Sequence, residues 1–226
     1  MLNLLFVEAS LGLVPGRTLR HPAVTRNARR EGKKPEETLL DRTLHHHAMH
    51  ELPEGEKKGR PDIIHFCLLE ALGAPLNLEG NLRLGIHTLN GVSIDVNPDV
   101  RLPRDGYRFK TLMERLLIEG QIPPAPDPPL MKTEQVTLHD LKERLKPSRT
   151  FALTSHGKPL KLENLCRIMA LESNPLAFIG AYPHGEYRQE TLVETDEQYS
   201  IYPKPLEAWV VTSRLIYEYE KQISSV

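Results

Sequence analysis

The sequence predicts an α/β fold built on a parallel sheet, and three observations point to it. From residue 149 onward, short apolar strands alternate with helical segments, which is the order of successive β-α-β units. The run 176–181 is continuously apolar, as is typical of a strand buried on both faces of a parallel sheet. Asn90-Gly91 separates two strand-like runs, 82–88 and 92–96, and predicts a type I′ hairpin added to that sheet.

The first sixty residues predict one strand and two helical segments. Residues 2–8 form a short apolar run, which favours a strand. Residues 22–34 are helix-compatible and basic. The segment 39–52 is expected to be helical, with Asp41 as its N-cap. Residues 54–59 then read as a polar loop.

The helix expected over Pro61–Leu72 has an unusual start. Its apolar residues cover nearly the whole circumference, which predicts a buried helix. Pro61 suits the first helical position and Asp62 suits the positive end of the helix dipole. Arg60 occupies the position where Ser, Thr, Asn or Asp is expected. Arg60 and Asp62 are therefore candidate site residues, and a purely structural Arg–Asp pair is an equally open interpretation.

The remaining segments follow in order along the chain. Five prolines within 122–130 exclude a helix or central strand, so 121–131 is expected to be a stiff extended linker or a crossing between two lobes. The pattern predicts helices over 107–119, 138–145, 160–171 and 205–221, and strands over 149–154 and 176–181.

Composition favours an ordinary globular protein of the cytoplasm. The 226 residues are 39% hydrophobic and 26% charged. No apolar run approaches the roughly 18 residues that span a bilayer, so no membrane partner is expected. Residues 1–14 lack a basic flank and make a poor signal peptide. Cys67 and Cys166 lie in apolar helical patterns and are expected in the core.

Charge is segregated along the chain although the net charge is −1. Residues 17–34 are strongly basic and residues 186–197 strongly acidic, which suggests a local anionic partner; a solvated basic helix face is the alternative. Arg101, Arg104 and Arg108 flank a helix start, where the dipole favours anions rather than cations. Arginine forks match phosphate oxygens, so these residues are expected to contact nucleic acid.

A ligand site is expected where three strands of the second half run into turns. Ligands of open α/β sheets bind beyond the carboxyl ends of the strands. Gly180 and Gly185 would let the backbone approach a flat ligand closely, and Pro203 and Pro205 leave neighbouring amides and carbonyls available for its edge. Neither a dinucleotide fingerprint nor a P-loop is present, so phosphate cradling is not expected. Ordinary turns of the sheet are the alternative interpretation.

The histidine-rich stretch 43–51 raises the possibility of a metal. His46 and His50 are spaced to chelate an ion on one helix face, but no third ligand is evident. We therefore expect packed or RNA-facing histidines and no metal, with a metal hydrolase as a weak alternative.

Six short segments together resemble one known family. They are Leu40-Asp-Arg-Thr-Leu-His-His, Gly59-Arg-Pro-Asp-Ile-Ile-His, Ala74-Pro-Leu-Asn, Ile86-His-Thr, Arg101-Leu-Pro-Arg and Phe178-Ile-Gly-Ala…His184-Gly. Spread over nearly the whole chain, they resemble the ribosomal-RNA pseudouridine N1-methyltransferases, a small-subunit ribosome biogenesis family of the SPOUT superfamily. The short chain without a long N-terminal extension is similar to the archaeal branch.

The resemblance implies a single SPOUT-type methyltransferase domain over 1–226, with a trefoil knot in a cofactor-binding region, 150–226, and a hairpin-containing insertion, 74–100. It also implies a homodimer and S-adenosyl-L-methionine as methyl donor. The cofactor residues implied are Leu153, Gly180, Gly185, Ile201, Tyr202, Pro203, Lys204, Pro205 and Leu206. Pro203-Lys204-Pro205 departs from the single Tyr-Pro of many relatives.

The implied reaction is methylation of N1 of a pseudouridine in a 16S rRNA hairpin during 30S ribosome biogenesis. Arg60 and Asp62 match the catalytic motif near the target base, and Arg60, Arg101, Arg104 and Arg108 match the RNA-binding arginines. Between two roles for Asp62, proton acceptor or anchor for Arg60, we favour the anchor, because an Asp beside an Arg is a weak base. Small-subunit ribosomal proteins stay open as partners. A non-catalytic rRNA-binding assembly factor is the alternative function.

Overall fold

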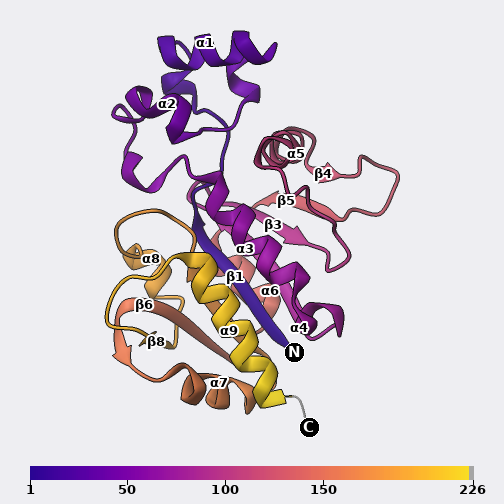
Figure 1. Ribbon diagram of the computed structural model, residues 1–226, viewed down its shortest axis with the longest axis vertical. Helices are drawn as coiled ribbons and strands as arrows, with labels where there is room; N and C mark the ends of the chain where they lie inside the picture. The colour runs from indigo at the N-terminus through magenta and orange to yellow at the C-terminus, as the bar shows by residue number, and fades with distance from the viewer. Residues whose placement is uncertain (224–226) are drawn as a thin grey trace.

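The computed structural model describes residues 1–223 as an α/β fold around an eight-stranded mixed sheet (Figure 1), which confirms the predicted class. The strand order is β4-β5-β3-β2-β1-β7-β6-β8. The strands are β1 (Leu2–Ala9), β2 (Leu82–Thr88), β3 (Val92–Val96), β4 (Gln121–Ile122), β5 (Met131–Gln135), β6 (Arg149–Pro159), β7 (Pro175–Gly180) and β8 (Glu197–Ser200).

The helices match the expected segments closely and add a few short turns. The α-helices are α1 (Pro22–Glu31), α2 (Arg42–Met49), α3 (Pro61–Gly73), α4 (Pro75–Leu78), α5 (Gly106–Glu119), α6 (Leu138–Leu145), α7 (Leu162–Ala170), α8 (Gln189–Leu192) and α9 (Ala208–Ile223). Three 3-10 turns are η1 (Gly16–Thr18), η2 (Pro35–Glu37) and η3 (Gly55–Lys57). No helix among these is long and apolar enough to cross a membrane.

The core forms on both faces of β1, which is buried along its whole length. Leu4 and Phe6 belong to the main core with residues of α3 and α9, while Leu5 and Val7 join a second cluster that α6 covers. This alternation follows from the two-residue period of a strand. Figure 1 shows α3 and α9 lying side by side over the sheet. Helix α3 is buried along one face, but Phe66 is 44% exposed and Leu69 is half-buried, so the expectation of a helix buried all round is wrong for the other face. Cys67 on its buried face is a free thiol, as is the buried Cys166.

The parallel half of the sheet brings three strand ends together. Strand β7 pairs in parallel with both β1 and β6, and β8 pairs in parallel with β6. The apolar run of β7 is buried from Pro175 to Ile179, as a central parallel strand requires. The carboxyl ends of β6, β7 and β8 therefore open at one edge. The trefoil knot that the resemblance implies stays a prediction.

The antiparallel half contains one confirmed hairpin and two corrections. Strands β2 and β3 form the expected hairpin, but residues 89–91 connect them and only Gly91 of the Asn90-Gly91 pair has a positive φ, so the turn is not the expected type I′. Strands β4 (121–122) and β5 also pair with each other, so residues 123–130 connect the two strands of a second hairpin, and the expected crossing between lobes is wrong. The prolines fit there because the exposed connection needs no ladder hydrogen bonds. Strand β5 escaped notice because only Met131 of its side chains is buried.

Strand β6 extends past residue 154, where the expected strand ends and a turn was predicted to follow. It continues to Pro159, but Leu153 and Lys158 both pair with Tyr199, so the residues between them are displaced from the ladder. A Cβ on Gly157 would lie 2.6 Å from the backbone nitrogen of Tyr199. Real Cβ contacts are never this short, so glycine is needed where the displaced segment crosses β8.

The first prediction tests this close approach. Gly157→Ala should destabilise the protein by about 1–3 kcal/mol or more, because backbone atoms of β8 must move aside. Gly106→Ala is the matched control, since a Cβ there meets nothing within 4 Å. Urea unfolding of both variants measures the difference. Equal midpoints for the two variants would contradict the close approach.

Residues 14–58 form a small lobe that contains α1 and α2, here called the α1–α2 lobe. It lies at the end of the molecule opposite the chain termini (Figure 1). Its own apolar cluster is made by Val14, Val24, Leu40, Ala48, Met49 and Leu52. Asp41 caps α2 as predicted, because its carboxylate accepts the Thr43 N–H at 2.9 Å. The lobe therefore has a separate local core beside the sheet.

Candidate functional site

A pocket opens at the carboxyl ends of β6 and β7, against the segment that precedes α9. Its walls include these expected cofactor residues: Leu153, Gly180, Gly185, Ile201, Tyr202, Lys204, Pro205 and Leu206. Pro203 lies in the same segment but outside the wall. The structure therefore gathers residues that are up to 53 positions apart (Leu153 to Leu206) into one site.

Two tyrosines that were not predicted shape this pocket. Tyr187 is buried, and its hydroxyl donates to the Leu153 carbonyl at 3.1 Å. Burial raises the pKa of Tyr187 well above its usual range, so the phenol stays a neutral donor. Tyr182 packs its ring where a Cβ on Gly180 would stand, 2.8 Å away. A side chain at position 180 would clash with the Tyr182 ring, so glycine is required there whether or not a ligand is bound.

The segment before α9 offers backbone donors to a ligand. Among residues 1–223, the N–H groups of Tyr202, Lys204 and Leu206 have no hydrogen-bond acceptor. Tyr202 and Lys204 are exposed and Leu206 is half-buried, so these donors are open to solvent or to a ligand. Pro203 and Pro205 alternate with these three residues and contribute no N–H of their own. The segment thus presents a row of amides suited to the hydrogen-bonding edge of a flat heterocycle.

A buried ion pair fixes the opposite wall of the pocket. Lys57 Nζ lies 2.7 Å from Glu8 Oε2, and the two side chains are only 7% and 5% exposed. Lys57 also donates to the Glu186 carbonyl and lies over the Tyr182 ring, 4.5 Å from its centroid. The second Glu8 oxygen accepts the Arg188 N–H at 2.7 Å. The pocket loop 182–188 is thereby fastened to the end of β1.

Arg188 secures the same loop to the α1–α2 lobe. Its guanidinium forms a two-pronged pair with Glu54, and Nη1 donates to the Leu89 carbonyl at 3.3 Å. Hydrogen bonding to Arg188 lowers the pKa of Glu54. The sequence offered one weak signal for this network, Glu8 as the lone acid at the end of an apolar strand; Lys57 and Glu54 looked like solvated loop residues.

The second prediction follows from the burial of this pair. Lys57→Met should cost about 3–5 kcal/mol, because Glu8 would be left buried without its partner. The double variant Glu8→Gln, Lys57→Met should recover part of that loss. Lys58→Met is the control, since Lys58 is only half-buried and makes no ion pair within residues 1–223. Urea unfolding that gave Lys57→Met and Lys58→Met the same stability would refute this role.

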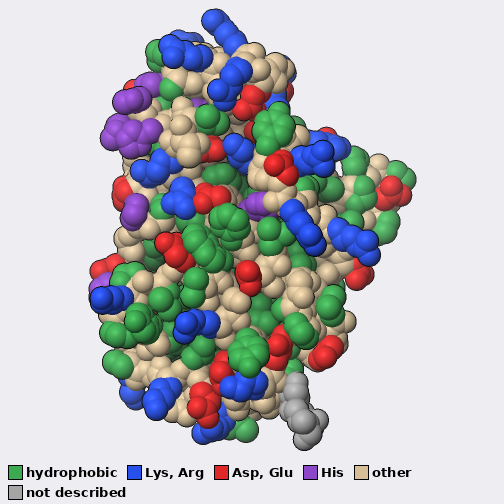
Figure 2. All heavy atoms as spheres, in the orientation of Figure 1, with side chains coloured by type: hydrophobic (Ala, Val, Ile, Leu, Met, Phe, Trp, Pro, Cys, Tyr) green, Lys and Arg blue, Asp and Glu red, His purple; other side chains and the backbone are tan. Residues whose placement is uncertain are grey.

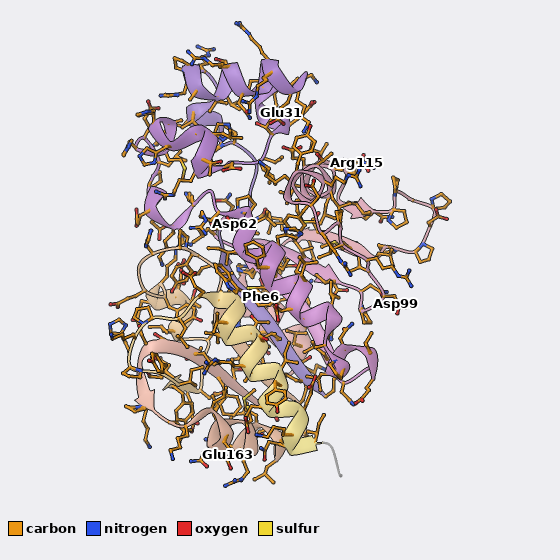
Figure 3. The ribbon with its side chains drawn as sticks, in the orientation of Figure 1. Phe6, Glu31, Asp62, Asp99, Arg115 and Glu163 are labelled. Carbon is orange, nitrogen blue, oxygen red and sulfur yellow. The ribbon has the colours of Figure 1, made fainter. Side chains whose placement is uncertain are left out.

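Arg60 and Asp62 form a close, planar pair at the start of α3 (Figure 3 labels Asp62). Arg60 Nε donates to Asp62 Oδ1 at 2.8 Å and Nη2 donates to Oδ2 at 2.7 Å. These hydrogen bonds raise the pKa of Arg60, and Glu207 beside the pocket adds to the effect. The side chains are 31% and 41% exposed, so the pair is accessible. The odd N-cap is explained: Arg60 pairs with Asp62 instead of capping the helix.

Ser10 links this pair to the pocket. The Arg60 N–H donates to Ser10 Oγ at 2.9 Å, and the Ser10 N–H donates to the Ala181 carbonyl at 2.8 Å. Ala181 follows Gly180, which lines the pocket. Both Asp62 oxygens are used by Arg60, while Arg60 Nη1 makes no hydrogen bond within residues 1–223. The free edge of the guanidinium is therefore available beside the pocket.

The three predicted RNA-binding arginines lie exposed at the start of α5. Arg101, Arg104 and Arg108 make no ion pair with any residue of 1–223. His65 of α3 bonds the Pro103 carbonyl through Nε2 at 2.7 Å, which ties this segment to the helix that carries Arg60 and Asp62. The backbone that carries Arg101 and Arg104 is thus positioned next to the candidate site.

The histidine stretch contains packed and exposed rings. His45 is buried, and its Nδ1 accepts the Asp41 N–H at 3.1 Å. Burial lowers the pKa of His45. His46 and His50 are exposed, with ring centroids 4.9 Å apart in an edge-to-face arrangement. Within residues 1–223 no three His, Cys, Asp or Glu side chains are grouped as metal ligands.

Comparison with known proteins places the chain in a family. A sequence model of the EMG1/NEP1 methyltransferase family matches residues 4–220. The chain is 47% identical to the ribosomal RNA small subunit methyltransferase Nep1 of Staphylothermus marinus over 215 residues, 95% of this chain and 93% of that one. It is 39% identical to Nep1 of Thermococcus onnurineus over 220 residues, 97% and 98% of the two chains.

A solved structure shows the same likeness. The crystal structure of Archaeoglobus fulgidus Nep1 bound to S-adenosylhomocysteine matches with a TM-score of 0.86 and 38% identity, over 97% of each chain. Sequence and structure agree over nearly the full length of both proteins. The chain belongs to the EMG1/NEP1 methyltransferase family.

Proposed function

We propose that this protein transfers a methyl group from S-adenosyl-L-methionine to N1 of a pseudouridine in a 16S rRNA hairpin, as a step of 30S ribosome biogenesis. The observation that carries the proposal is the contact chain from Arg60 through Ser10 to Ala181, which sets the Arg60–Asp62 pair beside the pocket. The names of the relatives, small-subunit rRNA methyltransferases, support the substrate class.

The residues of the pocket fit the cofactor. The unpaired N–H groups of Tyr202, Lys204 and Leu206 suit the edge of an adenine, and Leu153 and Ile179 give it apolar contact. The relative from A. fulgidus binds S-adenosylhomocysteine, the product of methyl donation. When bound, S-adenosylmethionine supplies a methyl group on a sulfonium, which reacts only with a nucleophile held in line.

Arg60 and Asp62 serve the acceptor base. Pseudouridine is joined to its sugar through carbon, so its N1 carries a removable proton. Loss of that proton to solvent water, which reaches the exposed pair, spreads negative charge onto a neighbouring carbonyl, and the free edge of Arg60 is suited to stabilise that charge. Asp62 holds Arg60 in place, since both of its oxygens already accept from the guanidinium. The two-pronged pair restricts Arg60 to one orientation.

The proposal also assigns roles to the exposed arginines near the site and to the assembly of the protein. The unpaired Arg101, Arg104 and Arg108 would bind phosphates of the hairpin and place the target base at Arg60. We place the protein in the cytoplasm as a homodimer, with the trefoil knot formed by the 150–226 region around the pocket. Small-subunit ribosomal proteins are further partners open to this role.

The third prediction tests the reaction itself. Two synthetic 16S rRNA hairpins that differ only in uridine or pseudouridine at the target are incubated with the protein and labelled S-adenosylmethionine. Methylation is expected on the pseudouridine hairpin alone, because the N1 of uridine is bonded to the sugar. Equal product on both RNAs would refute N1 specificity. Tight RNA binding without product or cofactor binding would favour the assembly-factor alternative.

The fourth prediction separates the roles of the two site residues. Arg60→Ala should lower the rate on the pseudouridine hairpin by about 100-fold or more, as expected when a charge-stabilising donor is lost. Asp62→Asn should lower it less, because one side of the two-pronged pair survives. Single-turnover rates at saturating cofactor measure both. Near-native rates for both variants would remove this pair from the mechanism.

A further inference from the structure

On the α1–α2 lobe, most acidic side chains are in ion pairs, whereas most arginines are not. Its acidic residues Glu31 and Glu37 are paired with lysines, Glu54 with Arg188, and Asp41 with Lys110. Five exposed arginines instead make no ion pair within residues 1–223: Arg17, Arg20, Arg26, Arg29 and Arg30. The lobe thus neutralises most of its carboxylates and leaves its arginines available.

Three of these arginines are free of any side-chain hydrogen bond within residues 1–223. They are Arg20, before α1, and Arg26 and Arg29 on it. Arg17 donates to the Glu51 carbonyl and Arg30 to Asn27, so those two have local partners. Arginine is the side chain best matched to phosphate, because its planar fork donates two parallel hydrogen bonds. A merely solvated helix face has no need of arginine over lysine.

The lobe is docked on the elements that carry the candidate site. The Arg42 N–H donates to the Gly59 carbonyl at 2.8 Å, directly before Arg60. On α5, Glu114 accepts from Lys33 at 2.6 Å and from the Leu39 N–H at 3.0 Å. The free arginines of the lobe therefore sit on a body held between Arg60 and the helix that begins beside Arg104. Figure 2 shows Lys and Arg side chains at the α1 end and again beside α5 on the same face.

We infer that Arg20, Arg26 and Arg29 form a second phosphate-binding surface, which grips the substrate RNA beyond the nucleotides that Arg101, Arg104 and Arg108 contact. The inference rests on the proposed function, since it assumes that RNA is the substrate. His46 and His47 of α2 are exposed on the same lobe and offer flat rings on which unpaired bases can stack. The lobe would then act as an arm that orients the RNA around the target base.

The test is the salt dependence of RNA binding. The triple variant Arg20→Gln, Arg26→Gln, Arg29→Gln is titrated with a pseudouridine-containing 16S rRNA hairpin that keeps its natural flanking strands. Each lost phosphate contact lowers the slope of log Kd against log salt by about 0.7–0.9, so a decrease of about 2–3 is expected. Affinity at low salt should fall at least tenfold. Thermal melting establishes that the variant is folded.

Two further variants make the outcome specific. The control, Arg83→Gln, Lys161→Gln, Arg214→Gln, removes the same charge from exposed residues outside the lobe that make no ion pair within residues 1–223. It should keep most of the wild-type slope. If the lobe variant matched this control while Arg101→Gln, Arg104→Gln lowered the slope, the second surface would be refuted and the proposed function would stand. If none of these variants changed the slope, the second surface and the proposed function would both be refuted.

Discussion

The buried ion pair between Glu8 and Lys57 is the constraint on which the site depends. Glu8 ends the central strand with a left-handed backbone, φ 50°, and Lys57 reaches it from the α1–α2 lobe. Through Glu186 and Arg188 the same two groups hold the pocket loop. Removing two charges from water is costly unless every remaining donor and acceptor is satisfied, and here most of them are. One ion pair thus joins the sheet, the lobe and the pocket.

The start of α3 is the second junction. Arg60 bonds Ser10 through its backbone and Asp62 through its side chain, so its position is set by β1 and its orientation by the helix. Gly59 before it packs closely against Met49 of the lobe, where a Cβ would lie 3.0 Å from the sulfur. Sheet, helix and lobe all meet at this one residue. That convergence explains why an arginine stands where a capping side chain is expected.

Much of the site could be predicted because its residues carry local signals. Glycines and prolines after apolar strands mark the carboxyl end of a parallel sheet, and this edge is where the pocket lies. The Glu8–Lys57 pair could not be predicted, since its partners are 49 residues apart and each looks ordinary in its own segment. The hairpin of β4 and β5 was missed for a related reason: β5 is mostly exposed, and its strand pairing comes from β3 beside it.

Local patterns in the sequence were enough to predict the α/β class, the apolar character of α3, the hairpin at Asn90-Gly91 and the strand ends at which the pocket opens, because periodicity and turn chemistry act over a few residues. Which charges are neutralised and which stay free is set instead by contacts between distant segments of the folded chain. The sequence of a basic run such as 17–34 is the same whether its side chains form ion pairs or stay unpaired on the surface. Lys33 and Lys57 of this lobe meet carboxylates from α5 and from β1, while its arginines meet none within the described chain, and that difference depends on long-range packing.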